Sequence, residues 1–280
     1  MARLLDILAL TKSYFSIASV ALLTLVSTLL AGVRDQYIIL ALLAFFIFLT
    51  ASLNSYNNLM DARADALTKK GFPIPSGAVS TEMATLVSAS LYGVSIVLLG
   101  WLSTINPYAG LILAADLILS FLYSAPRIRL KRLPVLKGSV LVFHSLFAPF
   151  TAASVISGFN PLNISDRLAT AFVMGMANHT LQDFGDMEGD RLLGDRTLPL
   201  MLGVRRCLYA VLAMYLLAMG LAALSTSSLQ PFTLALLAAQ AALTTPLLRD
   251  IRLWHIIFKV NAALSIATVV TIFYGCCPTV

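Results

Sequence analysis

The chain has 280 residues, of which 59% are hydrophobic and only 11% are charged. Soluble domains carry about 25% charged residues, so this composition excludes a soluble globular protein and indicates an integral membrane protein. The formal net charge of +6 is accounted for by membrane topology and by attraction to anionic lipid head groups, and it would also attract an anionic substrate.

Apolar segments long enough to cross a bilayer follow one another along the whole chain. A crossing helix needs about 20 apolar residues. Leu and Ala dominate these segments without strand-like alternation, so we expect helices and not a β-barrel. No small-residue cleavage site follows the first apolar run, which we therefore expect to remain as the first helix. The nine predicted transmembrane helices are 14–33, 36–58, 82–102, 107–124, 136–157, 167–182, 204–225, 230–248 and 255–275.

The basic residues are distributed unevenly between the two sides that nine helices would create. Of the 19 Lys and Arg residues, only Arg34 and Arg167 fall on the side opposite the N-terminus. The positive-inside rule predicts a multi-pass protein of the cell membrane with its charged loops in the cytosol. The other loops are short, so we expect one transmembrane domain over residues 1–280.

The first acidic motif, "NNLMDARADALTKKGFPIPSG", follows the second apolar segment. Asn57, Asp61 and Asp65 are spaced four residues apart, which places them on one face if the helix continues past Asp61. Lys69, Lys70 and a Pro-containing turn follow.

The second acidic motif, "DFGDMEGDRLLGDRTLP", follows the sixth apolar segment and ends on the same side of the membrane. Asp183, Asp186 and Asp190 again mark one helical face, followed by Arg191 and Arg196. We interpret the two motifs as a degenerate parallel repeat, with helices one to four carrying motif 57–77 and helices five to nine carrying motif 183–199.

Paired carboxylates at a membrane edge require cations. Mg²⁺ binds oxygen ligands and often uses one or two carboxylates together with substrate phosphates. Two facing acidic motifs could therefore hold two Mg²⁺ ions bridged by a diphosphate, with nearby Lys and Arg side chains on its remaining oxygens. Ordinary solvated loops are the alternative, but acids at membrane depth cost about 2.5–3.5 kcal/mol each, which argues against it.

A third charged segment, "LYSAPRIRLKR" at 122–132, follows the fourth apolar segment. It contains Tyr123, Arg127, Arg129, Lys131 and Arg132. These cations could clamp phosphate groups, or they could anchor the topology as positive-inside residues. Both interpretations remain open at this point.

Together these segments resemble the UbiA superfamily of intramembrane prenyltransferases. "NNLMDARAD" with "PIPSG", "YSAPRIRLK" and "DFGDMEGDRLLGDRTLPLMLG" are similar to three motifs of that family, and they occur in the same order. The resemblance implies nine helices around a central cavity, capped on the cytosolic side by loops 2–3, 4–5 and 6–7. It also implies that Mg²⁺ holds a prenyl diphosphate there for attack by an acceptor.

The resemblance also implies roles for individual residues. Tyr123 would line the reacting carbon, where its ring face could stabilise a cation. The implied catalytic residues are Asp61, Asp65, Asp183, Asp186, Asp190 and Tyr123. One Mg²⁺ would be held by Asn57, Asp61 and Asp65, and the other by Asp183, Asp186 and Asp190. The diphosphate would be contacted by Lys69, Lys70, Arg129, Lys131 and Arg196.

Some positions depart from the family pattern. Asn58 stands where an Asp is usual, and Phe72 stands where an Arg usually precedes the P-x-P-S-G segment. One expected phosphate contact is therefore missing, and Lys70 is the candidate to replace it. The stretch "NHTLQD" replaces a more charged segment before the second motif. These departures leave the subfamily open.

Several polar residues lie inside apolar segments, where such residues usually face the bundle interior. For Asp116 and His144 we expect interhelical hydrogen bonds. Asn178 and His179 are candidates for the acceptor side, with His179 either orienting the acceptor or accepting its proton. Lys259 could reach the cavity or extend towards the membrane surface.

The expected function is Mg²⁺-dependent transfer of a prenyl group, with geranylgeranyl diphosphate as the expected donor. We favour geranylgeranylglyceryl phosphate as the acceptor, in ether-lipid synthesis. Alternative acceptors are an aromatic ring, as in quinone biosynthesis, and a chlorophyll-type carboxylate. The non-enzymatic alternatives are a membrane transporter, which would have Gly- or Pro-broken helices at mid-membrane, and a lipid-binding structural protein, in which the acidic motifs would be dispensable. We expect membrane lipids as the surroundings, with no nucleic acid and no obligatory protein partner.

Overall fold

The computed structural model describes residues 4–11, 14–68, 71–225 and 227–276, and every regular element in these ranges is a helix. The prediction of an all-α protein is therefore confirmed for the described residues. The chain forms two compact units, each described separately below. The first comprises 1–29, 33–131 and 144–158, and the second comprises 30–32, 132–143 and 159–280.

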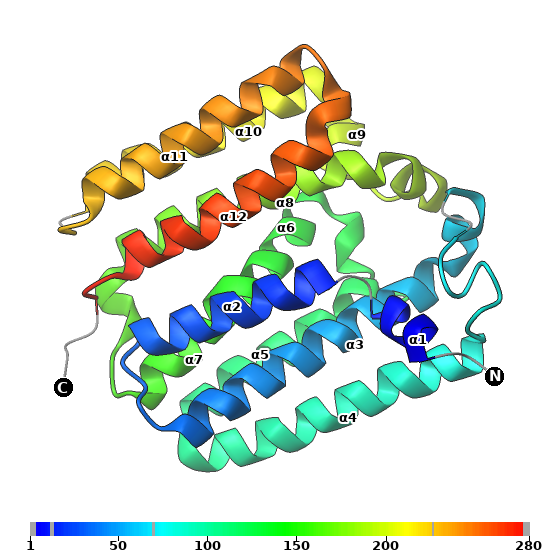
Figure 1. The fold of residues 1–280 in the computed structure, drawn as a ribbon, viewed down its shortest axis with the longest axis horizontal. Helices are drawn as coiled ribbons and strands as arrows, with labels where there is room; N and C mark the ends of the chain where they lie inside the picture. Colours follow the sequence, from blue (N-terminus) through cyan, green and yellow to red (C-terminus); the bar gives the residue numbers. More distant parts are fainter. Residues whose placement is uncertain (1–3, 12–13, 69–70, 226, 277–280) are drawn as a thin grey trace. The chain divides into compact units, whose positions relative to one another are not determined.

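The first unit is built around its longest helix, α3, which packs along α4 and also contacts α5 and α7 (Figure 1). Leu42, Phe45, Phe46 and Leu49 of α3 are fully buried. Their i, i+3, i+4, i+7 spacing is that of one helix face, so this stripe forms the core of the unit. The elements are α1 (Leu4–Leu10), α2 (Tyr14–Leu30), α3 (Gln36–Thr68), α4 (Thr81–Ile105), α5 (Pro107–Ser124), the 3₁₀ turn η1 (Leu130–Arg132), the π-helical turn η2 (Phe143–Phe147) and α7 (Ala148–Ile156).

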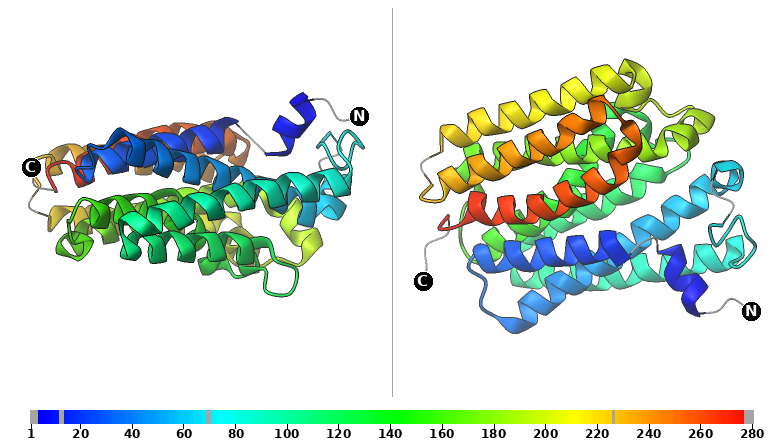
Figure 2. Two further views of the ribbon diagram at one scale, coloured as in Figure 1. Left: turned by 90° about the horizontal axis from the view of Figure 1, so that it is seen from below. Right: turned by 45° about the horizontal axis from the view of Figure 1, so that its top comes forward.

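The second unit is built around α8, which contacts α6, α10 and α12, while α11 packs against α10 and α12 (Figure 2). The elements are α6 (Pro134–Val142), η3 (Pro161–Ile164), α8 (Ser165–Leu193), α9 (Leu198–Leu202), α10 (Val204–Ala223), α11 (Gln230–Thr244), η4 (Thr245–Leu248), η5 (Ile251–Leu253) and α12 (Trp254–Phe273).

Local sequence signals set the helix ends. Asp35 caps α3, since its Oδ1 accepts a hydrogen bond of 2.7 Å from the Tyr37 amide. Asn106 caps α5 in the same way, ahead of Pro107 at the first helical position. Gly194 ends α8 with φ of 69°, a left-handed conformation that glycine adopts without strain.

Helices occupy each of the nine segments expected to be helical. Within the described residues, seven are long and apolar enough to cross a membrane, with α6, η2 and α7 forming one continuous candidate. The other two segments are α2, whose apolar part is the shorter stretch Ser16–Leu30, and α8, whose C-terminal part carries the second acidic motif. The number of crossings therefore remains a prediction.

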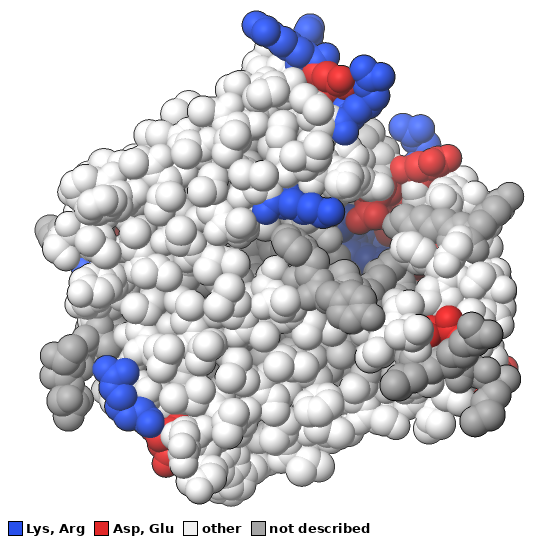
Figure 3. Space-filling model, in the orientation of Figure 1, with Lys and Arg blue, Asp and Glu red and all other residues white. Residues whose placement is uncertain are grey.

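The surface agrees with burial in lipid. Val97, Leu111 and Leu216 are among the large apolar side chains that point outward, with exposed fractions of 72%, 68% and 63%. Figure 3 shows broad areas without Lys, Arg, Asp or Glu. Apolar surface on this scale is uncommon in soluble monomers and indicates an integral membrane protein.

Candidate active site

The first acidic motif lies on the last turns of α3. The helix extends to Thr68, so the expectation that it continues past Asp61 is confirmed. Asp61 and Asp65 are buried and Asn57 is half-buried. Their four-residue spacing places all three on one face of α3. Buried carboxylates require positive partners, which come from the segment after α5.

Two cations of the third charged segment bind this motif. Arg129 Nη2 donates to Asp61 Oδ1 at 2.9 Å, and Lys131 Nζ donates both to Asp61 Oδ2 and to Asn57 Oδ1. Ser124, at the end of α5, also donates to Asn57 Oδ1, at 2.9 Å. Arg129 and Lys131 are both buried. The segment therefore binds the acidic motif and is more than a topological anchor.

The turn that delivers Arg129 is strained. Arg129 has φ of 43°, in the left-handed region that residues other than glycine rarely adopt. The amides of Ile128 and Arg129 both donate to the Ala125 carbonyl, which closes the turn tightly after α5. Strain of this kind costs about 1–3 kcal/mol and concentrates at functional sites. Here it places the guanidinium beside Asp61.

Tyr123 completes the cluster in the first unit. Its ring is buried at the end of α5, and Lys131 Nζ lies 5.9 Å from the ring centroid. An ammonium at this distance from an aromatic face is within the range of a cation–π interaction. The predicted side chains Asn57, Asp61, Tyr123, Arg129 and Lys131 thus lie together, whereas Lys69 and Lys70 lie outside the described residues.

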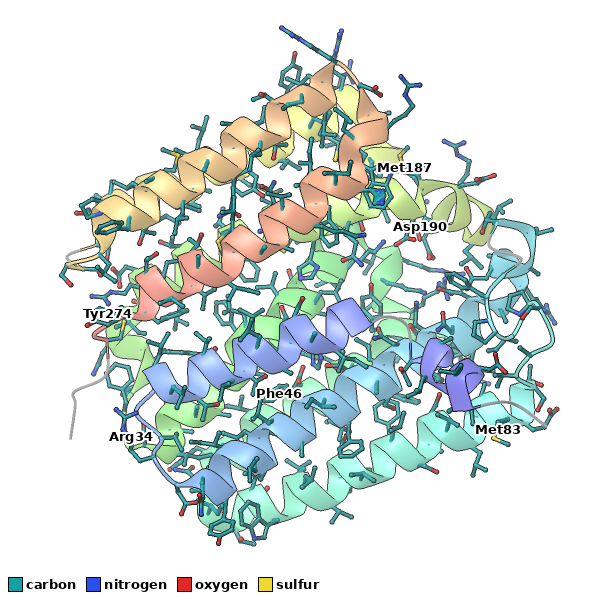
Figure 4. The ribbon with its side chains drawn as sticks, in the orientation of Figure 1. Arg34, Phe46, Met83, Met187, Asp190 and Tyr274 are labelled. Atoms are coloured by element: carbon teal, nitrogen blue, oxygen red, sulfur yellow. The ribbon has the colours of Figure 1, made fainter. Side chains whose placement is uncertain are left out.

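The second acidic motif is bound by a lysine that we did not predict. Lys137 Nζ lies 2.7 Å from Asp183 Oδ1 and 3.0 Å from Asp190 Oδ2, and all three side chains are buried. Asp183 and Asp190 are seven residues apart, close to two turns of helix, so they share one face of α8. Figure 4 labels Asp190 and its neighbour Met187 on this helix. The pKa of Asp190 is raised above its ordinary value, chiefly by burial and also by the nearby Asp186 carboxylate, although the Lys137 ammonium acts in the opposite direction.

Close packing of α6 on α8 positions Lys137. A Cβ atom at Gly138 would lie 2.9 Å from the Met176 side chain, and one at Gly175 would lie 2.8 Å from Val142. Neither glycine could be replaced without moving its neighbour, so the two helices approach through these positions. The sequence signal for Lys137 was a lone charge at the start of an apolar segment, which positive-inside topology explained equally well.

The remaining predicted residues of the second unit have diverse surroundings. Asp186 is half-buried, and Arg196 is exposed, its backbone amide donating to the Arg132 carbonyl at 3.1 Å. His179 is half-buried, with Nδ1 3.4 Å from Gln182 Oε1.

Asn178 belongs to a buried polar network. Its Nδ2 donates to Ser265 Oγ at 2.7 Å, and its Oδ1 accepts from the Tyr215 hydroxyl at 3.0 Å. Gln240 and Asn261 extend the network across α11 and α12. These bonds join four helices of the second unit. A contact of Asn178 with an acceptor remains a prediction, and its hydrogen bonds in the structure are to protein groups.

The expectation of interhelical hydrogen bonds for Asp116 and His144 is confirmed. His144 Nδ1 lies 2.9 Å from Asp116 Oδ2, and Nε2 lies 2.9 Å from Thr50 Oγ1. The π-helical turn η2 carries His144 into this position. The three residues are buried and join α3, α5 and η2.

The acidic motifs offer carboxylate and amide oxygens, which are ligands that Mg²⁺ accepts. Among the described residues no three His, Cys, Asp or Glu side chains lie close enough to hold a metal on their own. Each motif instead directs two side-chain oxygens at one cation: those of Asn57 and Asp61 at Lys131, and those of Asp183 and Asp190 at Lys137. Mg²⁺ typically takes one or two carboxylates and completes its shell with water and substrate phosphate.

Comparisons with known proteins identify the family. A family model described as "UbiA prenyltransferase family" matches residues 19–272. Digeranylgeranylglyceryl phosphate synthase from Methanopyrus kandleri is 32% identical over 187 residues, which cover 66% of this chain and 66% of that protein. The enzyme of the same name from Methanoregula boonei is 31% identical over 201 residues, 71% of this chain and 68% of that protein. The matched region thus spans about two thirds of the length of these relatives.

The fold has relatives among solved structures. A UbiA homologue from Archaeoglobus fulgidus, bound to DMAPP and Mg²⁺, aligns with a TM-score of 0.69 over 94% of this chain and 99% of that chain. Its sequence identity of 20% shows a shared fold and no more.

Proposed function

Because the chain belongs to the UbiA prenyltransferase family, we propose that it transfers a prenyl group from an isoprenoid diphosphate to geranylgeranylglyceryl phosphate in a Mg²⁺-dependent reaction. The observation that carries this proposal is that each acidic motif directs two side-chain oxygens at a single cation. The Mg²⁺ found with DMAPP in the Archaeoglobus fulgidus homologue supports the choice of metal.

In this proposal each motif would hold one Mg²⁺ ion: Asn57 and Asp61 would hold the first, with Asp65 as a further ligand. Asp183 and Asp190 would hold the second, with Asp186 moving in as a further ligand once the ion is bound. When bound, Mg²⁺ neutralises the charge that develops on the departing diphosphate. Arg129, Lys131 and Arg196 donate to the diphosphate oxygens, and Lys69 and Lys70 are further candidates for this contact. Because Arg129 and Lys131 are already held in place, little reorganisation is needed when charge develops on the leaving group.

The apolar helices give the allylic end of the donor a dry environment. Tyr123 presents an aromatic ring beside Lys131, where it can stabilise positive charge on the reacting carbon. Excluding water prevents hydrolysis of that carbon before the acceptor attacks.

The acceptor is inferred from the relatives. Those from Methanopyrus kandleri and Methanoregula boonei are both named digeranylgeranylglyceryl phosphate synthase. This favours the phosphorylated prenylglycerol over the aromatic and chlorophyll-type acceptors. We also infer nine membrane crossings, with the acidic and basic loops forming a cap on the cytosolic side, as the distribution of Lys and Arg predicts.

The test is a transfer assay with the purified chain in detergent. Labelled geranylgeranyl diphosphate is incubated with Mg²⁺ and, separately, with geranylgeranylglyceryl phosphate and 4-hydroxybenzoate. We expect a doubly prenylated phospholipid with the first acceptor and none after chelation of divalent cations. Product with 4-hydroxybenzoate alone, or transfer that persists in EDTA, would refute the proposal.

A further inference from the structure

A pocket of 210 Å³ lies within the second unit, beside the second acidic motif. It is lined by Gln182 and Asp186 from α8 and by Trp254, His255, Phe258 and Lys259 from α12. Pockets that enclose drug-sized ligands measure about 300–1,000 Å³, so this smaller pocket has room for a phosphate head group.

The pocket opens on a different face of α8 from the one that binds Lys137. Successive residues of an α-helix are rotated by about 100°, which places Asp183 and Asp190 within about 20° of each other. By the same geometry Asp186 lies about 60° away from Asp183, and Gln182 lies about 100° away on the same side. Asp186 therefore stands at the boundary between the proposed metal site and the pocket.

The α12 wall of the pocket carries hydrogen-bond donors and aromatic rings. His255 and Lys259 are four residues apart, as are Trp254 and Phe258, so each pair is stacked along the helix. The Lys259 ammonium provides three donors, and the His255 ring provides a further one. The side chains of His255 and Lys259 line the pocket and are exposed.

A close approach between the two helices fixes the position of Trp254. A Cβ atom at Gly185 would lie 2.2 Å from the Trp254 ring, so only glycine leaves space for the indole here. The ring therefore forms a well-defined wall against the α8 backbone, next to Asp186.

We propose that this pocket binds the phosphate head group of the prenyl acceptor, with Lys259 and His255 donating to the phosphate oxygens. The proposal rests on the proposed function, in which two anionic substrates must meet. The cations assigned to the donor diphosphate are Arg129, Lys131 and Arg196, with Lys69 and Lys70 as further candidates, so the acceptor phosphate requires donors of its own. The donors Lys259 and His255 lie on the α12 side of the pocket, so the phosphate binds there and the reacting end of the acceptor stays near Asp186 and the metal site.

Binding can be measured by tryptophan fluorescence, without turnover, because the chain contains only two tryptophans, Trp101 and Trp254. Replacing Trp101, which is on α4 in the other unit, by Phe leaves Trp254 as the sole tryptophan reporter of the pocket. Titration with geranylgeranylglyceryl phosphate should change the Trp254 emission, and Lys259→Met should weaken binding by about tenfold or more, since a charge-assisted hydrogen bond is lost. Geranylgeranylglycerol, which lacks the phosphate, should bind equally to both variants.

Arg206→Met is the matched control, because it removes one exposed cation of the same unit outside the pocket. Arg206→Met should leave the affinities for geranylgeranylglyceryl phosphate and for geranylgeranylglycerol within twofold of those of the parent. If Lys259→Met binds the phosphorylated lipid as tightly as the parent, the pocket assignment is wrong whether or not prenyl transfer occurs. If no acceptor is prenylated but the binding still depends on Lys259, the proposed function fails and the pocket assignment stands.

Steady-state kinetics separate the two anionic substrates. We expect Lys259→Met and His255→Gln to raise the KM for geranylgeranylglyceryl phosphate by about tenfold and to leave the KM for the prenyl diphosphate within twofold. A rise confined to the KM of the prenyl diphosphate would overturn the proposal, since it would assign these side chains to the donor.

Discussion

The two acidic motifs differ in the number of cations that bind each carboxylate. In the first unit two cations, Arg129 and Lys131, contact one carboxylate, Asp61. In the second unit one cation, Lys137, contacts two carboxylates, Asp183 and Asp190. Within these contacts the first motif has an excess of positive charge and the second an excess of negative charge. The second should therefore bind an added divalent cation more readily, and the first should more readily attract a diphosphate.

The local structures that supply the cations also differ. Arg129 and Lys131 come from a tight turn and a 3₁₀ turn with one strained residue, whereas Lys137 comes from a regular helix packed through glycines. The strained turn at Arg129 is held in place by the contacts around it, whereas the helix that carries Lys137 is held by close packing. Four variants test whether these differences matter.

The largest effect is expected for Lys137→Met. Its loss leaves Asp183 and Asp190 buried without their shared ammonium, which should cost about 3–5 kcal/mol of stability. Thermal unfolding in detergent should show a lower midpoint, and Mn²⁺ should restore much of the loss because it takes the position of the ammonium. Lys137→Arg serves as the charge-preserving control. An unchanged midpoint, or a midpoint that Mn²⁺ does not raise, would contradict the unequal charge of the two motifs.

Lys131→Met tests the first motif. It removes the cation shared by Asn57 and Asp61 while Arg129 keeps Asp61 paired, so the chain should still fold. The value of kcat/KM for the prenyl diphosphate should fall by about 100-fold or more, the range seen when one donor to a developing anion is lost. Arg127→Met, which removes an exposed cation of the same segment, should change it by less than about threefold. Equal effects of the two variants would show that only the overall charge of the segment matters.

A buried polar cluster outside both motifs provides a reference. His144→Phe leaves Asp116 without its imidazole partner and should lower stability by about 1–3 kcal/mol. The kcat/KM of the remaining folded protein should stay within about threefold of the parent, in contrast to Lys131→Met. Circular dichroism melting together with activity per folded molecule measures both quantities. A loss of turnover with unchanged stability would assign this cluster a role in the reaction.

The smallest effect is expected for Arg196→Met. Its side chain is exposed, so a contact with the diphosphate would be partly screened by water and salt and should contribute no more than about 1 kcal/mol. The KM for the prenyl diphosphate should therefore rise by less than about fivefold, and less at high ionic strength. A 100-fold rise would show that Arg196 is buried against the substrate when it binds.

Much of the fold could be predicted because its signals are local. Apolar runs predicted helices in nine places, and the structure has a helix in each. The four-residue spacing of Asn57, Asp61 and Asp65 was sufficient to place them on one face of α3. The additional short helix α1 was not predicted, since seven residues give too little periodicity to distinguish a helix from a loop.

The partners of the motifs were predicted unevenly. The basic segment 122–132 was singled out as a phosphate clamp or a topological anchor, but its contacts with Asp61 were not predicted. Lys137 was missed because it is 46 residues from Asp183 in the chain and carries no motif of its own. Asn178 and His179 are adjacent in sequence, yet Asn178 is buried in a network of four helices and His179 is half-buried.

The sequence alone determined the membrane class, the positions of the helices and the two carboxylate-bearing faces, because hydropathy and helical spacing act over a few turns of chain. Only the tertiary structure decided which cation lies on which carboxylate, and that a pocket with Lys259 adjoins Asp186. These pairings join residues far apart in the chain, and burial removes the water that would otherwise solvate each charge. Their identity therefore depends on how closely the helices pack and not on any short stretch of sequence.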